Sequence, residues 1–177
     1  MGGTAEPLFR LADMEAAREA ADRLFEETVR SLRPVLPETA EIHHVGATAI
    51  PGCLTKGDLD MVVRVAASDF RTADRALGAR YVRNTGSVRT ETFSAFEQRE
   101  SVPPLGIQLT AKGGEQDFFH LFIARLLADP ALVARYNALK RRFEGKPMDV
   151  YRAAKSDFIC QVLDRPGPHA SEVEEDS

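Results

Sequence analysis

The chain has 177 residues, of which 44% are hydrophobic and 28% charged, as is typical of one globular domain that is long enough to bury a core. No apolar run approaches the roughly 20 residues that span a bilayer, and the N-terminus lacks the basic and apolar regions of a signal peptide. We therefore expect a cytoplasmic protein that has no membrane segment.

The charge of the chain is unevenly distributed. The net charge is −4, and four of the 27 acidic residues lie in residues 171–177, which leaves 23 acids against 23 bases elsewhere. A neutral body lacks the basic surface that binds the phosphates of a nucleic-acid polymer. We expect the partner to be a small phosphorylated ligand or a nucleotide.

The first half of the chain predicts two helices and two strands after a loose leader at residues 1–12. Apolar residues at helical spacing predict a helix over 14–33, with Asp13 as its N-cap. Short apolar or alternating runs predict strands over 41–45 and 58–65. A further helix is expected between Ser68-Asp69, which resemble a cap, and a glycine stop at Gly78.

The second half of the chain predicts more strands and then only helices. Strands are expected near 81–82, 91–96 and 105–110. Helices are expected from Asp117, from Asp129-Pro130 to Gly145, and over 148–164, and the acidic tail at 166–177 is expected to be disordered. The order of these helices and strands along the chain predicts an α+β domain with a small mixed sheet flanked by helices and a C-terminal helical subregion.

The most informative segment is residues 44–63. Side chains alternate along a strand, so Asp58 and Asp60 share a face, roughly 7 Å apart, and can reach a pair of divalent ions. Upstream, Gly46 and its small neighbours form a turn whose free N–H groups could bind phosphate. The alternative is that Asp58 and Asp60 form only a solvated strand end.

These residues resemble a known family. The glycine turn at Gly46 followed by Asp58-Leu59-Asp60 is similar to the signature of the nucleotidyltransferase superfamily, which has the polymerase-β-like fold. The longer block from His44 to Gly52, followed by Lys56, resembles H-[IV]-G-S-T-[SA]-[VI]-P-G of the GrpB-like family. Three blocks near the C-terminus resemble the same family, which extends the domain over 13–165.

The resemblance implies a nucleotidyltransferase-like fold and a Mg²⁺-dependent transfer of a nucleoside monophosphate from an NTP to a small acceptor. Asp58 and Asp60 would be the catalytic metal ligands. The phosphate-binding residues would be Gly46, Ala47, Thr48 and Lys56, although Lys56 could equally be solvated. The further pocket residues would be His44, which could brace the turn, Gln108, Arg125 and Lys155.

The chain departs from the superfamily pattern at two positions that matter for catalysis. Ala47 replaces the usual serine, and the strand expected to supply a third carboxylate offers Gln108, whose amide brings no charge to a dication. Fallback candidates for that carboxylate are Glu91, Glu97 and Asp117. Both departures favour an alternative function, namely a non-catalytic accessory domain that binds a nucleotide or a CoA-related ligand. In the family that the chain resembles, GrpB-like domains occur fused to dephospho-CoA kinases, which is consistent with such a ligand.

Overall fold

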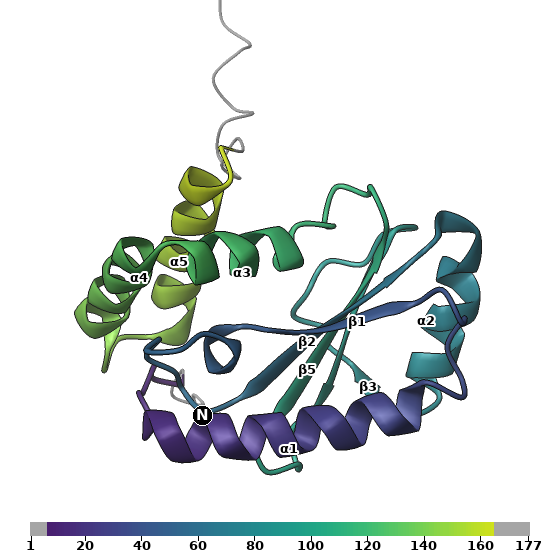
Figure 1. Cartoon of the computed structure of the whole chain (residues 1–177), viewed down its shortest axis with the longest axis horizontal. Coiled ribbons are helices and arrows are strands. Elements are labelled where there is room, and N and C mark those ends of the chain that lie inside the picture. The colour runs from purple at the N-terminus through teal and green to yellow at the C-terminus, as the bar shows by residue number, and fades with distance from the viewer. Residues whose placement is uncertain (1–6, 165–177) are drawn as a thin grey trace, which may run out of the picture.

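A five-stranded mixed sheet lies at the centre of the computed structural model, which describes residues 7–164 (Figure 1). The spatial order of the strands is β1-β2-β5-β4-β3. Their bounds are β1 Glu41–Val45, β2 Leu59–Val65, β3 Val82–Arg83, β4 Phe93–Gln98 and β5 Leu105–Ala111. The prediction of a small mixed sheet is confirmed.

The pairing of the strands determines which side chains meet. β1 pairs antiparallel with β2, and Val45 lies opposite Asp60. β2 pairs parallel with β5, and Asp60 lies opposite Gly106. β4 then pairs antiparallel with β5 and with β3. Residues that lie opposite each other project from the same face of a sheet, so the register decides which residues can surround Asp60.

Helices cover both faces of this sheet. Leu59, Met61 and Val63 of β2 pack in one hydrophobic core with α1 (Met14–Leu32) and α2 (Phe70–Gly78). Val62 points to the other face and packs in a second core with the three C-terminal helices. These are α3 (Phe119–Ala128), α4 (Pro130–Phe143) and α5 (Met148–Val162), which gather at one end of the sheet in Figure 1.

Capping side chains explain where two of the helices begin. The Asp13 Oδ1 atom accepts a hydrogen bond from the Ala16 N–H at 2.9 Å and so caps α1. Asp129 caps α4 in the same way, and Pro130 follows it at the first helical position. Asp69 stands at the N-cap position of α2, but its side chain makes no capping bond there, because a short 3₁₀ turn, η2 (Ala67–Asp69), leads into the helix.

The prediction of a loose leader over 1–12 is wrong for residues 7–12, and residues 1–6 lie outside the described residues. Phe9 is buried and stacks on Tyr151 with 3.8 Å between the ring centroids. Its backbone exchanges hydrogen bonds with Gly145 and Lys146, each 2.8 Å long. One aromatic side chain therefore fastens this segment to the C-terminal helices.

The remaining boundaries differ from the predictions by one or two residues. β4 begins at Phe93 rather than at Glu91, because the Thr90 N–H donates to the Phe93 carbonyl and closes a turn before the strand. The predicted disordered tail lies outside the described residues. Within residues 7–164, no helix is both long and apolar enough to cross a membrane.

Candidate functional site

The turn after β1 brings its backbone against Asp60. Gly46 has φ +79° and ψ −177°, a conformation that side-chain-bearing residues rarely adopt, and it leads into the 3₁₀ turn η1 (Ala47–Ala49). A Cβ atom at Gly46 would lie 2.8 Å from Asp60 Oδ2. A glycine is therefore required here both by the backbone conformation and by the nearby carboxylate.

Asp60 is half-buried and has no hydrogen-bonding partner within residues 7–164. Its other oxygen, Oδ1, lies 2.9 Å from where a Cβ atom of Gly106 would be, so the carboxylate sits between two glycines. No described residue donates a hydrogen bond to it. Burial, and then the charge of Asp58, raises the pKa of Asp60 to about 6. A buried carboxylate without donors attracts a cation, because a cation replaces the lost hydration.

Asp58 lies one residue before β2 and already has a cationic partner. The Lys56 Nζ atom lies 2.7 Å from Asp58 Oδ2, and the Lys56 and Asp58 side chains are 38% and 20% exposed. This ion pair at the edge of the site can open towards a ligand, since exposed ion pairs contribute little to stability. Lys56, for which contact with phosphate or with solvent was expected, thus lies against Asp58.

His44 and Thr48 fix the position of the Asp58 backbone. The Thr48 hydroxyl donates to the Asp58 carbonyl oxygen at 3.2 Å and has no second hydrogen to give, so His44 Nε2 donates to the Thr48 Oγ1 atom at 2.9 Å. Burial lowers the pKa of His44 in spite of Asp22, whose carboxylate lies 3.3 Å from Nδ1. Since Thr48 is buried and engaged, a phosphate at this turn would meet backbone N–H groups rather than its hydroxyl.

Helix α4 holds the loop that precedes Asp58. Asn137 accepts a hydrogen bond from the Leu54 N–H and donates one to the Gly52 carbonyl, both 2.8 Å long. Lys140 is 2% exposed and donates to the Leu54 carbonyl, and its Nζ atom lies 3.3 Å from Cys53 Sγ. Burial lowers the pKa of Lys140 to about 8, against the opposing effect of Cys53. Two polar side chains thus tie the loop to the helical subregion.

Removing Asn137 tests this attachment. We expect Asn137→Ala to lower the free energy of unfolding by about 2–3 kcal/mol, because two backbone groups lose their partners in a largely buried place. Urea denaturation followed by circular dichroism measures the change. Asn84→Ala removes an amide that accepts one 3.0 Å bond in an exposed turn and should cost less than about 1 kcal/mol. Equal losses in the two variants would contradict the role of Asn137.

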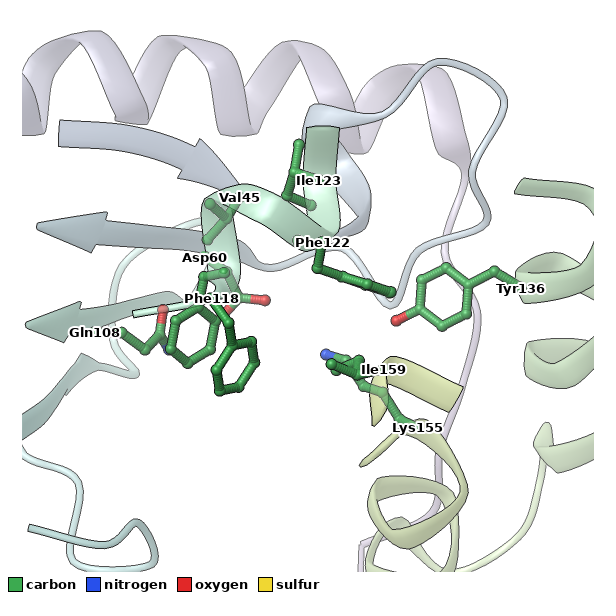
Figure 2. Close-up of a pocket in the computed structure, with 11 residues that line it drawn as sticks. Val45, Asp60, Gln108, Phe118, Phe122, Ile123, Tyr136, Lys155 and Ile159 are labelled. Atoms are coloured by element: carbon green, nitrogen blue, oxygen red, sulfur yellow. The ribbon is translucent and has the colours of Figure 1, made fainter. Parts of the chain in front are cut away.

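The Asp60 carboxylate opens onto a pocket between the sheet and the helical subregion. The pocket contains about 500 Å³ of space, its mouth included. Figure 2 shows Asp60, Gln108 and Phe118 on one side, and the Lys155 amine and the Tyr136 hydroxyl on the other. Burial alone would lower the pKa of Lys155, but the acidic groups of Tyr151, Asp60 and Asp58 raise it overall. Lys155 is therefore a cation that faces the carboxylate across the pocket.

Gln108 lies where the third carboxylate was expected. It stands on the same face of β5 as Gly106, two residues further along, and its Oε1 atom is buried without a donor among the described residues.

The three fallback candidates for that carboxylate lie elsewhere. Asp117 binds Arg64 through both oxygens, at 2.6 and 2.8 Å. Glu97 lies across Gly106 from Asp60 but pairs with Arg99 at 2.9 Å. Glu91 is exposed in the turn before β4.

The donor set fits one Mg²⁺ ion better than two. Mg²⁺ is commonly held by one or two carboxylates together with water and substrate phosphates, and Asp60 and Asp58 can supply the carboxylates. Among the residues that the structure describes, no group of three His, Cys, Asp or Glu side chains converges to hold a metal ion. A third protein carboxylate beside Asp60 is therefore missing from the described chain.

Of the four further pocket residues that were expected, Gln108 and Lys155 line this pocket, whereas His44 and Arg125 do not. Arg125 is exposed and lines a separate groove with Leu121 and Leu163. Gly106 was missed, and only the pairing of β2 with β5 could have revealed it. The helical subregion also contributes lining residues for which the sequence predicted no role in the site: Phe118, Phe119, Phe122, Tyr136 and Ile159.

Comparison with protein families and curated sequences identifies relatives of the chain. The family model described as GrpB protein matches residues 13–165. A UPF0157 protein of Vibrio cholerae serotype O1 is 32% identical over 156 residues, which cover 88% of this chain and 80% of that protein. These matches confirm the resemblance that the sequence blocks indicated.

Solved structures confirm the fold. The chain is similar to the conserved protein GrpB from Enterococcus faecalis, with a TM-score of 0.66 and 19% identity over 82% of this chain and 93% of that one. It is also similar to the Cid1 poly(U) polymerase, in an H336N mutant bound to MgATP, with a TM-score of 0.50 and 10% identity over 73% of this chain and 42% of that one. The domain has a nucleotidyltransferase-like α+β fold.

Proposed function

The chain belongs to the GrpB family, and from this premise we propose that it is a Mg²⁺-dependent nucleotidyltransferase that moves a nucleoside monophosphate from an NTP to a small acceptor. The observation that carries the proposal is the Asp60 carboxylate, which lies without a donor between Gly46 and Gly106 at a pocket that also contains Lys155. The similarity to a polymerase bound to MgATP supports the choice of ligand class.

The chemistry uses the two charges of the pocket in different ways. Mg²⁺ bound at Asp60 and Asp58 would neutralise phosphate oxygens and polarise the phosphorus that is attacked. The Lys155 amine, which faces Asp60, would bind the phosphates that leave as pyrophosphate. Free N–H groups of the Gly46 turn would hold further phosphate oxygens. Held in this way, the α-phosphorus would be attacked by the acceptor oxygen as its bond to the departing pyrophosphate breaks, and the acceptor proton would pass to water.

Two observations favour a second function. Gln108 supplies an amide near Asp60 where catalysis by two ions would need a carboxylate, and Lys56 already neutralises Asp58. A site with one metal ion can bind a nucleotide without transferring it. The alternative is therefore a non-catalytic domain that binds a nucleotide or a CoA-related ligand.

Titration calorimetry tests the proposal. We expect MgATP or MgGTP to bind the wild type and not the Asp58→Asn, Asp60→Asn double mutant. The matched control is Asp157→Asn, an exposed carboxylate on α5, which should bind like the wild type. If a folded wild-type protein bound neither nucleotide, the transferase would be overturned, and so would an accessory domain that binds a nucleotide.

A second assay separates the two functions. Wild-type protein is incubated with MgATP and a panel of small acceptors that carry hydroxyl or phosphate groups, and released pyrophosphate is measured. Pyrophosphate release by the wild type that is absent from the Asp58→Asn, Asp60→Asn double mutant supports the transferase. Tight binding without release under every acceptor supports the accessory domain.

A further inference from the structure

Lys56 is bound to one of the two carboxylates that the proposed function assigns to a metal ion. Its Nζ atom lies 2.7 Å from Asp58 Oδ2, and the Lys56 and Asp58 side chains are 38% and 20% exposed. An ion pair that solvent reaches on both sides contributes little to stability, so a stronger charge can break it. Any cation that binds Asp58 through Oδ2 must therefore displace Lys56.

The backbone on both sides of Lys56 is fixed. Thr55 is 1% exposed, and its carbonyl accepts a hydrogen bond from the Ala12 N–H at 2.9 Å. The Thr55 hydroxyl accepts another from the Gly57 N–H at 3.0 Å. The Lys56 side chain, by contrast, is an ammonium on a flexible stem. It can turn from Asp58 to another anion while the loop stays in place.

The charges of the site favour such an exchange. Asp58 and Asp60 contribute two carboxylates, and the ammonium groups of Lys56 and Lys155 balance them. A divalent ion bound at both carboxylates adds positive charge beside two cations, which is unfavourable. A triphosphate that arrives with the ion removes this excess and offers Lys56 phosphate oxygens in place of the carboxylate that it leaves.

From these contacts we infer that Lys56 couples the binding of the metal ion to the binding of the phosphates. Lys56 competes with the ion for Asp58 and, once displaced, binds a phosphate oxygen of the nucleotide. The site therefore prefers the metal–nucleotide complex to the free ion. This inference rests on the proposed function, since it places a metal ion at Asp58 and Asp60.

Mn²⁺ alone and its tripolyphosphate complex test the inference at pH 8. Electron paramagnetic resonance measures binding of the free ion, with the Asp58→Asn, Asp60→Asn double mutant as the background, and calorimetry measures binding of the complex. We expect Lys56→Met to bind Mn²⁺ alone about three- to fivefold more tightly than the wild type, because no ion pair has to break. It should bind the complex about tenfold more weakly, because a charged hydrogen bond to phosphate is lost.

Two control variants separate this exchange from a general effect of charge. Lys112→Met removes an ion pair of the same 2.7 Å length, which Lys112 forms with Glu41. Lys112 lies at the far end of β2 from Asp60, where its N–H bonds to the Val65 carbonyl, and its variant should bind both ligands like the wild type. Lys56→Arg keeps the positive charge and should gain no affinity for Mn²⁺.

The inference and the proposed function fail in different ways. A Lys56→Met protein that binds Mn²⁺ alone no more tightly than the wild type would overturn the inference, because Lys56 would not compete for Asp58. So would a Lys56→Met protein that binds the tripolyphosphate complex as well as the wild type does. A wild type that binds neither this complex nor MnATP would overturn the proposed function itself.

Discussion

The Asp60→Asn variant is expected to lose metal-dependent nucleotide binding by at least about 100-fold and, without ligand, to be more stable than the wild type at pH 8. The affinity falls because the amide carries no charge for the dication. The stability rises because the ionised Asp60 is half-buried, lies near the charge of Asp58 and receives no hydrogen bond from any described residue, and its pKa is raised to about 6 from 3.8. The folded state therefore holds the Asp60 proton more tightly than the unfolded state does.

The sign and the pH range of the stability effect follow from this pKa. Below about pH 4 the protonated Asp60 carboxyl contributes fully to the free energy of unfolding of the wild type. This contribution is lost as the pH rises through about 6. At pH 8 we expect a gain of about 1–2 kcal/mol for Asp60→Asn, less than the full shift implies, because the carboxylate is partly exposed and Lys155 loses its neighbour. Urea denaturation at pH 8 and pH 4 measures it.

A matched variant isolates the effect of burial at Asp60. Asp58→Asn removes the partner of Lys56 at the edge of the site and should change stability by less than about 1 kcal/mol at either pH. If Asp60→Asn destabilised the ligand-free protein at pH 8, the carboxylate would have a stabilising partner, and the account of an open metal ligand would be wrong.

The Gly46→Ala variant is expected to be destabilised by about 3–4 kcal/mol and to lose nucleotide binding. Alanine is strained at φ +79°, and its Cβ atom would lie 2.8 Å from Asp60 Oδ2, so the carboxylate or the turn must move. Thermal unfolding gives the stability, and calorimetry with MgATP gives the binding.

Two other glycines separate strain from steric overlap. Gly52 has φ +72° and nothing within 4 Å of an added Cβ atom, so Gly52→Ala should cost only about 1–2 kcal/mol and leave binding intact. Gly106→Ala adds a Cβ atom 2.9 Å from Asp60 Oδ1 without a positive φ and should impair binding more than stability. A Gly46→Ala protein that matched Gly52→Ala in both measurements would show that the turn does not confine Asp60.

Much of the fold was predictable because its signals are local. The spacing of Ala17, Ala21 and Leu32 is that of a helix with one buried face, and Asp13 and Asp129 are caps that act within three residues. The burial of Phe9 was not predictable, because it depends on Tyr151, a partner 142 positions away. Only tertiary contact reveals that this segment is fixed.

The residues of the candidate site also fall into those with a local sequence signal and those that depend on contacts between distant segments. Asp58, Asp60 and Gly46 could be proposed as site residues because alternation along one strand and a glycine turn can be recognised from neighbouring residues. Gly106 was missed because its role comes from the register of β2 with β5, two segments that are distant in sequence. Arg125 was expected in the pocket from its match to a family block, which does not report which groove a side chain enters, and it lines a separate groove.

The most direct test of the central claim is a Mn²⁺ titration followed by electron paramagnetic resonance, with ATP present, at pH 8 and at pH 5. We predict that the wild type binds the MnATP complex at pH 8 and releases it at pH 5, where Asp60 is mostly protonated, while excess Mn²⁺ keeps the free complex formed. Asp60→Asn should not bind it at either pH. Equal binding by the wild type and Asp60→Asn would contradict the claim that Asp60 holds the metal ion of a nucleotide site.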